Sequence, residues 1–485
     1  MTIITAAVLL GCASAPDRKP PSVDLEAPED WTGGDVEVAA PDSTAAQWWS
    51  GFDDTTLVNL VDEALGNNFD ILAAGARVDQ AVAQARIAGA DVWPQLGMSL
   101  NGGRARNNFI GFPGPQGQDV LTVRSNSFGA SLDLSWEIDL WGRIRKGKEA
   151  ALADVQASWA DLAAIRMSIG AQTVKSYFAV LEARDQVALT EQIVSSFRSS
   201  AEQVRRRYEE GVVSSVDLRL ALSAQANSEA LLALRRQLLD AGTRQLEILL
   251  GRYPAAAVDA IAALPQVEGQ VPGGLPSELL LRRPDLLAAE RRWAASESRV
   301  SASRRAFFPR IALTASAGAS SNQLEDIVDF NFGVWSLAAG LVQPIFQGGR
   351  LRANLQRSHA IADQSLVAYV QSLQRAFGEV EIALVAERML VEQQNHLAEA
   401  ARQSESARQL AERQYNAGLA DFITVLETQR QSFTAQIDLL TVRRRRLDAR
   451  VNLHLALGGG FDLTSEWSEF LEQSNPRTLD AGGSK

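Results

Sequence analysis

The sequence has little cysteine, histidine and methionine: one, three and four residues among 485. With Cys12 as the only thiol, disulfides within the chain, thiolate metal sites and cysteine catalysis are excluded. The histidines, His359, His396 and His454, lie far apart in the sequence. No segment has the spacing of a metal site, a nucleophile elbow or a phosphate-binding glycine loop. The residues therefore predict no enzyme, no catalytic residue, no metal and no other cofactor.

The balance of charge is acidic. A net charge of −11, with 46% hydrophobic and 22% charged residues, is ordinary for a folded protein. It argues against a nucleic acid as partner, because such proteins carry basic patches. A soluble acidic protein and a protein with a cation-tolerant surface or lumen both remain compatible with it.

The N-terminus contains a short apolar segment that ends at Cys12, after which the chain becomes polar and rich in proline. This pattern resembles a bacterial lipoprotein signal, in which the cysteine becomes the lipidated N-terminus. We therefore expect a signal-like segment over 1–12 with a lipid on Cys12; a chance cysteine in an ordinary cleaved leader is the alternative. Residues 13–66 are predicted to form an extended tether followed by an amphipathic, equatorial helix.

The clearest hydrophobic repeat lies in a long proline-free stretch, residues 351–415. Steps of 4, 3, 4, 3, 4 and 7 separate Leu366, Val370, Leu373, Phe377, Val380, Leu384 and Val391. This is the pattern of helices that pack nearly parallel, and such a helix would be roughly 95 Å long. The stretch predicts a long rod or one wall of a long hollow structure.

The chain repeats itself. The segment Tyr208–Gly211 returns 207 positions later as Tyr415–Gly418, and Pro94 returns 215 positions later as Pro309. This period is too long for a solenoid, so the sequence predicts an internal duplication. We expect a first repeat over 67–282, with a helical hairpin over 146–250 and an equatorial linker over 251–282. A second repeat over 283–457, with a helical hairpin over 350–457, would be followed by a polar tail over 458–485. Because the paired helices start from corresponding points, the turns at Gly211 and Gly418 are expected to lie together.

Each repeat also contains a segment with the alternation of a β-strand pair, at 95–141 and at 309–346. In the first, alternation over 95–101 is followed by a Gly/Pro/Asn-rich loop expected over 102–126 and by a return strand to Leu140. One face of these strands is apolar and the other carries Ser, Asp and Glu. Strands of about 9 to 11 residues are long enough to cross a membrane.

Aromatic residues cluster at or near the ends of these strands, as in the interfacial belt of a membrane barrel. Burial at a domain junction is the alternative. The candidates for the belt are Trp93, Trp136, Trp141, Phe308, Trp335 and Phe346.

Four strands per chain cannot close a barrel in lipid, because a membrane sheet has no open edge and known barrels begin near eight strands. Several chains must therefore share one wall. A dimer would give eight strands and a filled lumen, and a trimer would give twelve strands and a passage.

With these features, the sequence resembles the outer-membrane efflux protein family, the TolC-like ducts, and within it the NodT-type lipoproteins. The matching segments cover nearly the whole chain: Trp48–Asp53, Asn67–Asp70, Pro94, Trp136–Gly142, Leu275–Leu280, Arg282–Asp285, Pro309, Gln343–Phe346, Gly348–Gly349 and the two Tyr-x-x-Gly turns. The resemblance implies a homotrimer whose twelve-stranded β-barrel in the outer membrane continues into a long α-helical periplasmic barrel. It further implies a lipid-anchored exit duct for small molecules, working with a periplasmic adaptor and an inner-membrane pump of the resistance-nodulation-division class.

The resemblance also assigns residues. It implies adaptor docking at Tyr208, Gly211, Val212, Tyr415, Gly418 and Leu419. It implies a gate at the tunnel mouth with Asp217 and Glu427, and with Thr424 where some members have aspartate. The alternative for Asp217 is a helix N-terminal carboxylate favoured by the helix dipole.

Two other functions stay open. A duct for secreted proteins, of the type I secretion kind, would share the fold, and the fold does not select the cargo. A structural periplasmic coiled-coil lipoprotein would explain the helices but not the strand pairs.

Overall fold

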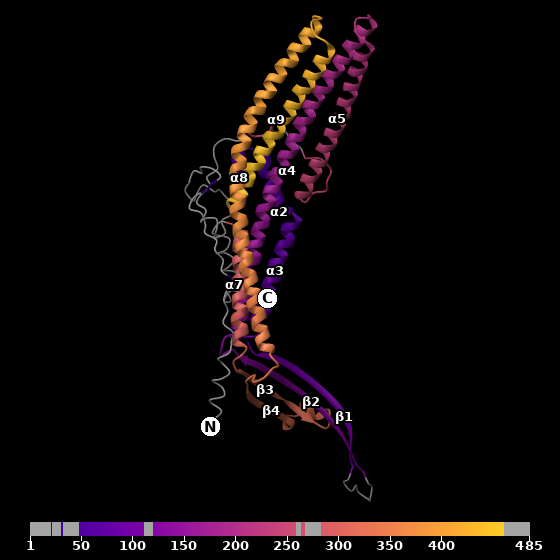
Figure 1. Cartoon of the computed structure of the whole chain (residues 1–485). Coiled ribbons are helices and arrows are strands. Elements are labelled where there is room, and N and C mark those ends of the chain that lie inside the picture. The colour runs from indigo at the N-terminus through magenta and orange to yellow at the C-terminus, as the bar shows by residue number, and fades with distance from the viewer. Residues whose placement is uncertain are drawn as a thin grey trace. The chain divides into compact units, whose positions relative to one another are not determined.

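The structure is a computed structural model that describes residues 21, 31–32, 48–110, 120–258, 263–266 and 283–459. Cys12, most of the tether, most of the 251–282 linker and the tail beyond residue 459 lie outside the described residues. The elements in chain order (Figure 1) are η2 (Trp48–Phe52), α2 (Thr55–Asn67), α3 (Phe69–Ala90), β1 (Gln95–Ile110), β2 (Val120–Ile138), α4 (Arg143–Glu209), α5 (Ser215–Leu249), α7 (Pro284–Arg305), β3 (Arg310–Ser321), η4 (Glu325–Val328), η5 (Phe330–Phe332), β4 (Gly333–Val342), α8 (Arg350–Asn416) and α9 (Phe422–Ala456).

The chain divides into two compact units. The first unit comprises 1–23, 78–158 and 289–369 and contains the β-sheet. The second unit comprises 24–77, 159–288 and 370–485 and contains α2, α5, α9 and the greater parts of α4 and α8.

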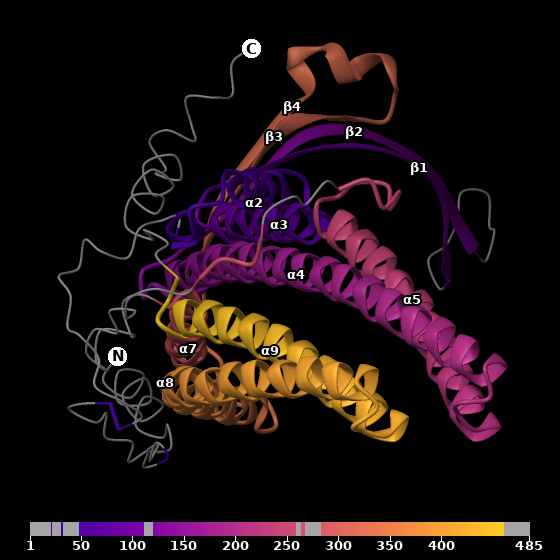
Figure 2. The same ribbon diagram turned by 90° about the horizontal axis from the view of Figure 1, so that it is seen from above.

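The sheet of the first unit is antiparallel, with its strands in the order β1-β2-β3-β4. Its register aligns apolar residues across the four strands, as in the row Met98, Leu132, Ala317 and Trp335. The pleat turns the alternate residues to the other face, which carries Ser99, Asp133, Ser316 and other small polar side chains. Gly318 permits close packing here, because a Cβ atom at this position would lie 2.0 Å from the carbonyl oxygen of Ala130. Figure 2 shows the curvature of β1 and β2.

One sequence prediction about this sheet is wrong. The loop expected over 102–126 is mostly strand, because β1 runs to Ile110 and β2 starts at Val120. Glycine and asparagine predicted a loop there, but the backbone pairing continues through Gly103↔Ser127 to Ile110↔Val120. Hydrogen bonds along the ladder and the register set by the preceding apolar pairs outweigh the low strand propensity of these residues.

The link from β2 to α4 is fixed by a carboxylate. Asp139 accepts hydrogen bonds from the backbone N–H groups of Ile144 (3.1 Å) and Arg145 (2.8 Å), which are free donors in the first turn of the helix. Nearby in the same unit, α7 packs against both long helices. Arg299 forms an ion pair with Asp154 of α4, and Ser303 lies 2.8 Å from the Ser358 hydroxyl of α8.

The second unit consists of long helices that pack side by side. Figures 1 and 2 both show α4 beside α5 and α8 beside α9. The largest apolar cluster joins α2, α4, α5 and α9 around Tyr177 and Phe178, with Trp48 and Trp49 of η2 packed against it. Asp54 caps α2 by accepting from the backbone N–H groups of Thr56 and Leu57, and it also accepts from the Tyr177 hydroxyl at 2.7 Å. Burial, and after it the hydrogen bond to Asp54, raises the pKa of Tyr177.

The predicted duplication is visible in the lengths of the helices. The helices α4 and α8 both have 67 residues, α5 and α9 both have 35, and α3 and α7 both have 22. In the described part of the chain, no helix combines the length and the apolar character needed to cross a membrane.

Candidate functional site

The two turns that close the long helices have the same backbone geometry. Gly211 and Gly418 have φ values of 76° and 73°, in the left-handed region that favours glycine. After α4, Gly211 N–H donates to the Tyr208 carbonyl and Val212 N–H to that of Arg207; after α8, Gly418 and Leu419 donate to Tyr415 and Gln414. This double hydrogen bond is the Schellman motif, which ends a helix and starts a sharp reversal.

The two turns lie together, as predicted. The guanidinium of Arg207 donates to the Tyr415 carbonyl at 3.1 Å and lies 4.5 Å from the centre of the Tyr415 ring. The Gln203 amide donates to the Asn416 side chain. An apolar cluster that includes Val204, Tyr415 and Phe422 completes the junction. Arg207 therefore fastens the end of the first hairpin to the end of the second.

Apolar side chains are exposed at both turns. Val212 is 67% exposed and Leu419 is 79% exposed. Soluble monomers keep such residues scattered, whereas exposed apolar residues at two neighbouring turns indicate a contact surface. In contrast, the ring of Tyr415 is buried and is not available at this surface.

The predicted gate residues lie close to the turns. Asp217 is in the first turn of α5 and forms a capping box with Ser214: its carboxylate accepts from the Ser214 backbone N–H (3.1 Å) and hydroxyl (2.8 Å). Its role as a helix N-terminal carboxylate is thus present in the structure. On α9, Glu427 is exposed and its carboxylate lies 3.7 Å from Arg430, and Thr424 is exposed in the first turn.

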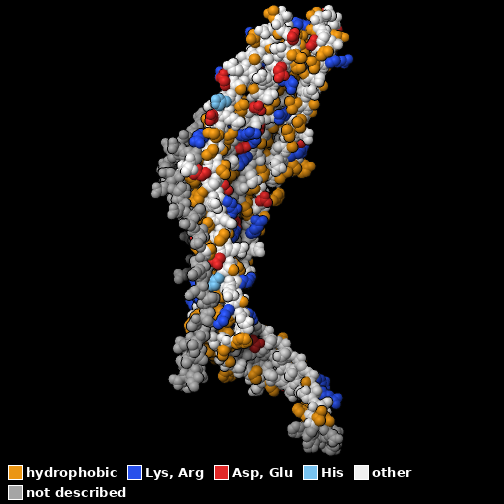
Figure 3. Space-filling view, in the orientation of Figure 1, with side chains coloured by type: hydrophobic (Ala, Val, Ile, Leu, Met, Phe, Trp, Pro, Cys, Tyr) orange, Lys and Arg blue, Asp and Glu red, His pale blue; other side chains and the backbone are white. Residues whose placement is uncertain are grey.

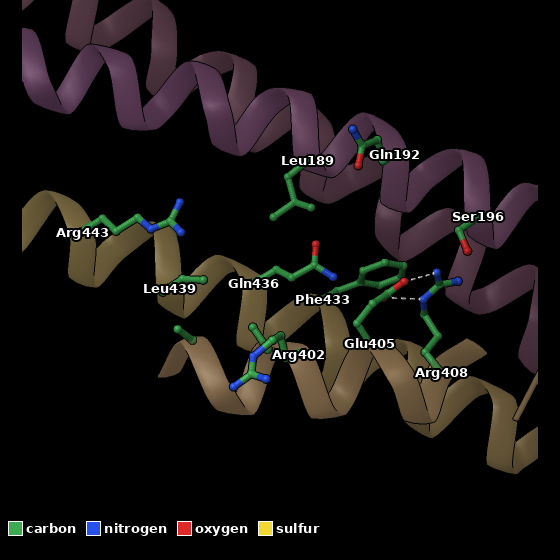
Figure 4. A pocket seen from close by; sticks show the side chains of 12 residues that line it. Leu189, Gln192, Ser196, Arg402, Glu405, Arg408, Phe433, Gln436, Leu439 and Arg443 are labelled. Carbon is green, nitrogen blue, oxygen red and sulfur yellow. Dashed lines mark hydrogen bonds and ion pairs between the residues drawn. The ribbon is translucent and has the colours of Figure 1, made fainter. Parts of the chain in front are cut away.

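An open cavity of about 650 Å³ lies between α4 and the α8–α9 pair (Figure 4). Its main polar group is Glu405, which accepts from Arg408 (2.6 Å), from Gln409 and from the Ser432 hydroxyl (2.9 Å). These donors, Arg408 first, lower the pKa of Glu405 to about 2. Arg408 also pairs with Glu412 at 2.7 Å. The hydrogen bond from Ser432 to Glu405 thus connects α9 to the charged residues of α8 that line the cavity. This ionic cluster was not predicted from the sequence, although acids and bases three and four residues apart on a helix are a usable signal.

The polar face of the sheet has its own hydrogen-bonded group. The Asp133 carboxylate accepts from the hydroxyls of Ser99 (3.1 Å), Ser131 (2.9 Å) and Ser316 (2.8 Å), which come from three adjacent strands. The charge of this carboxylate is therefore stabilised on the face opposite the apolar rows.

The predicted belt aromatics occupy the ends of the strands. Trp141 stacks on Phe308 with ring centres 5.2 Å apart and donates to the Pro309 carbonyl, while Trp136 donates to the Val92 carbonyl. The rings of Trp93, Trp335 and Phe346 are exposed, Trp335 by 79%. In the described residues, no group of His, Cys, Asp and Glu could hold a metal ion.

Comparison with known proteins identifies this architecture. Residues 60–252 and 275–459 match the profile described as outer membrane efflux protein. The chain belongs to this family. Each matched segment contains one of the two long helical hairpins, and the family is one of channels.

Similar proteins extend over almost the whole chain. A pyoverdine export outer membrane protein of Pseudomonas putida is 32% identical, with 94% of this chain and 96% of that protein covered. The outer membrane protein OprJ of Pseudomonas aeruginosa is 34% identical, with 95% of each chain covered. The crystal structure of the Campylobacter jejuni CmeC outer membrane channel is 25% identical, with a TM-score of 0.85, and 95% of this chain and 98% of that chain are covered.

These matches confirm the predicted fold class and function: the chain is the outer-membrane channel component of an efflux pump.

Proposed function

We propose that three copies of this chain form one duct in the outer membrane. The observation that carries the proposal is the sheet, which has an exposed apolar face, a polar face and two strands, β1 and β4, at its edges. Exposed edges are not tolerated in lipid, so β1 of one subunit pairs with β4 of the next until the wall closes. Twelve strands leave a wet passage, whereas eight would be filled by side chains.

The polar face lines this passage. Asp133, held by three serine hydroxyls, would give one carboxylate per subunit on the lumenal wall, while Leu96, Met98, Trp335 and Leu337 face lipid. Trp93, Trp136, Trp141, Phe308, Trp335 and Phe346 form the interfacial belt. Alternation of lipid-facing and lumen-facing residues is the pattern of a membrane barrel.

The helical turns dock a periplasmic adaptor, which connects the duct to an inner-membrane pump of the resistance-nodulation-division class. The paired turns, with exposed Val212 and Leu419, support this assignment because a rigid, partly apolar tip suits a protein contact. Tyr208 and the two turn glycines belong to the same surface. Buried Tyr415 contributes by holding the tip together rather than by contact.

Asp217 on α5 and Glu427 on α9, with Thr424 one turn before Glu427, form the gate at the tunnel mouth. Three copies of each carboxylate at a constriction would attract cations and repel anions. A lipid on Cys12 would add an anchor in the same membrane. The duct is passive, its cargo is small molecules supplied by the pump, and the chain itself catalyses no reaction.

The test of the gate is ion conductance in planar bilayers. The double variant Asp217→Ala/Glu427→Ala should raise the conductance of the closed duct and weaken its preference for cations. Ser214→Ala separates gating from helix capping, because it breaks the capping box and leaves the carboxylate. A second control, Glu202→Ala/Asp438→Ala, removes two other exposed acids. Unchanged conductance and selectivity in the double variant would show that the gate lies elsewhere.

A further inference from the structure

The β1–β2 pair continues beyond the four-stranded sheet. The pairing of β2 with β3 ends at Phe128↔Ser321, whereas β1 and β2 pair with each other as far as Ile110↔Val120. Residues 103–110 and 120–127 therefore form a two-stranded ribbon at the end of the sheet opposite the helices of this unit. Strand β4 stops at Gly333, which lies in the row of Leu100, so the described strands of the chain do not cover the ribbon.

Three arginines lie together on one face of this ribbon. Arg104, Arg106 and Arg124 are all exposed, and Arg106 is directly opposite Arg124 in the register. Their even positions place them on the face that carries Leu96, Met98 and Leu132 further down the same strands. Figure 3 shows Lys and Arg side chains gathered on this part of the hairpin, next to hydrophobic ones.

The arrangement is unfavourable without an anion. Like charges directly opposite each other in an antiparallel pair destabilise it. Within the described ranges, none of the three arginines forms an ion pair. The acidic residues at this end of the sheet, Glu325, Asp326 and Asp329, belong to the connection between β3 and β4, where Asp326 accepts from Ser321 and Asp329 from its own neighbour Asn331. The three guanidinium groups therefore present free donors outwards.

The height of the arginines matches the edge of a membrane. Arg104 and Arg106 lie 9 and 11 residues after Gln95, the first residue of β1. At about 3.4 Å per residue and a tilt of about 45°, this distance corresponds to about 22 and 26 Å across the membrane. The apolar band of such barrels is about 25 Å tall. The arginines thus lie where the hydrocarbon ends and the lipid headgroups begin.

We propose that Arg104, Arg106 and Arg124 bind the phosphate groups of a phosphorylated glycolipid in the outer leaflet. The guanidinium fork binds phosphate with two parallel hydrogen bonds, and an anion between Arg106 and Arg124 removes their repulsion. The lipid-facing side of the ribbon excludes a ligand of the lumen. A lipid anchored in the leaflet also presents its phosphate at this height without the entropic loss of a free ion.

Binding of lipid A to the detergent-solubilised full-length protein tests the proposal. Native mass spectrometry would count the bound lipids, and a titration would give the affinity. The variant Arg104→Gln/Arg106→Gln/Arg124→Gln should bind on the order of a hundredfold more weakly, about fivefold for each positive charge near an anionic surface. The matched control is Arg77→Gln/Arg86→Gln/Arg388→Gln, which removes three exposed arginines from helices and should bind like the wild type.

Further binding experiments distinguish a lipid phosphate from free phosphate. Dephosphorylated lipid A and phosphatidylglycerol should bind more weakly than lipid A, and inorganic phosphate should not displace it at millimolar concentration. The variant with Lys at the same three positions should keep part of the affinity for lipid A. Such binding would also show that substitution at these positions leaves the protein folded. Equal binding by the Gln variant, equal binding of dephosphorylated lipid A, or displacement by inorganic phosphate would overturn the proposal.

The inference rests on the proposed membrane placement, but the two fail separately. If the duct is placed correctly and the lipid site is wrong, the Gln variant conducts and binds lipid A like the wild type. If the placement is wrong, the wild-type protein does not conduct in bilayers at all.

Discussion

The helices of the two repeats have equal lengths but carry different side chains at equivalent positions. The helices correspond residue by residue, 207 positions apart, and both turns use a left-handed glycine. Yet Tyr208 is 42% exposed, while Tyr415 is 6% exposed and lies under Arg207. The repeat therefore determines where the chain bends, and individual side chains determine which copy is fastened at its tip.

The same contrast holds at the start of the returning helices. In the first repeat Ser214 and Asp217 form a complete capping box. In the second, the equivalents are Asp421, whose side chain makes no cap hydrogen bond, and Thr424. At the third residue of the returning helix, only the first repeat thus carries a carboxylate, Asp217, and this carboxylate also serves the helix cap.

At the other end of these helices, a buried acid corresponds to a partly buried histidine. Glu247 accepts from the backbone N–H groups of Ala256 (2.7 Å) and Ala257 (2.6 Å). Its counterpart His454 stacks on Trp48 with ring centres 5.0 Å apart. The first repeat therefore holds the segment that follows α5, whereas the second holds η2 near the N-terminus. The two contacts can be tested separately.

The tyrosines should show the largest difference between the copies. Tyr415→Ala removes a buried ring and should lower the free energy of unfolding by roughly 3 to 5 kcal/mol, whereas Tyr208→Ala should cost less than about 1 kcal/mol. Denaturant unfolding of the solubilised protein measures both values. Tyr415→Phe is the control, because the buried hydroxyl has no hydrogen-bond partner among the described residues, so its loss should be nearly neutral. Similar losses of unfolding free energy in Tyr415→Ala and Tyr208→Ala would contradict the proposed difference between the two tyrosines.

The stability of the fold should depend on pH because of His454. Burial, together with the charge of Arg450, lowers the pKa of His454 to about 4. The unfolded residue has a pKa of about 6.5, so the folded state binds the proton more weakly. Neutral His454 makes its full contribution to the free energy of unfolding above about pH 6.5. This contribution, roughly 3 kcal/mol, is lost as the pH falls towards 4.

The measurement is the melting temperature between pH 8 and pH 4.5. His454→Phe keeps the stacking and should flatten the acid side of the curve, while the exposed His396→Gln should leave it unchanged. An identical pH profile in the wild type and in His454→Phe would contradict the assignment.

The N-caps of α5 and α9 should show the smallest difference in stability between the two repeats. Ser214→Ala should cost about 1 kcal/mol, because the first-turn N–H of Asp217 loses its acceptor. Asp421→Ala should cost only a few tenths, since its side chain bonds no first-turn N–H. Hydrogen exchange of the first turns of α5 and α9 measures both effects, and an equal acceleration in the two helices would show that the caps are equivalent.

Much of the fold was predictable from the sequence, because its periodicities are long. The heptad seam around Val380 and the two Tyr-x-x-Gly segments determined the helices and their turns. The extent of the first hairpin was not predictable, since Gly103 and Asn107 have loop propensity and only pairing with β2 keeps them extended. The contact of Arg207 with Tyr415 was also missed, because it joins residues 208 positions apart that nothing in their local sequence connects.

The mass of the complex extracted from membranes in mild detergent tests the central claim most directly. If the sheets of several subunits share one wall, native mass spectrometry will show a species with three times the mass of the single chain measured under denaturing conditions. A uniform population of single chains would contradict the account, because the edges of β1 and β4 would then have no partner within the membrane.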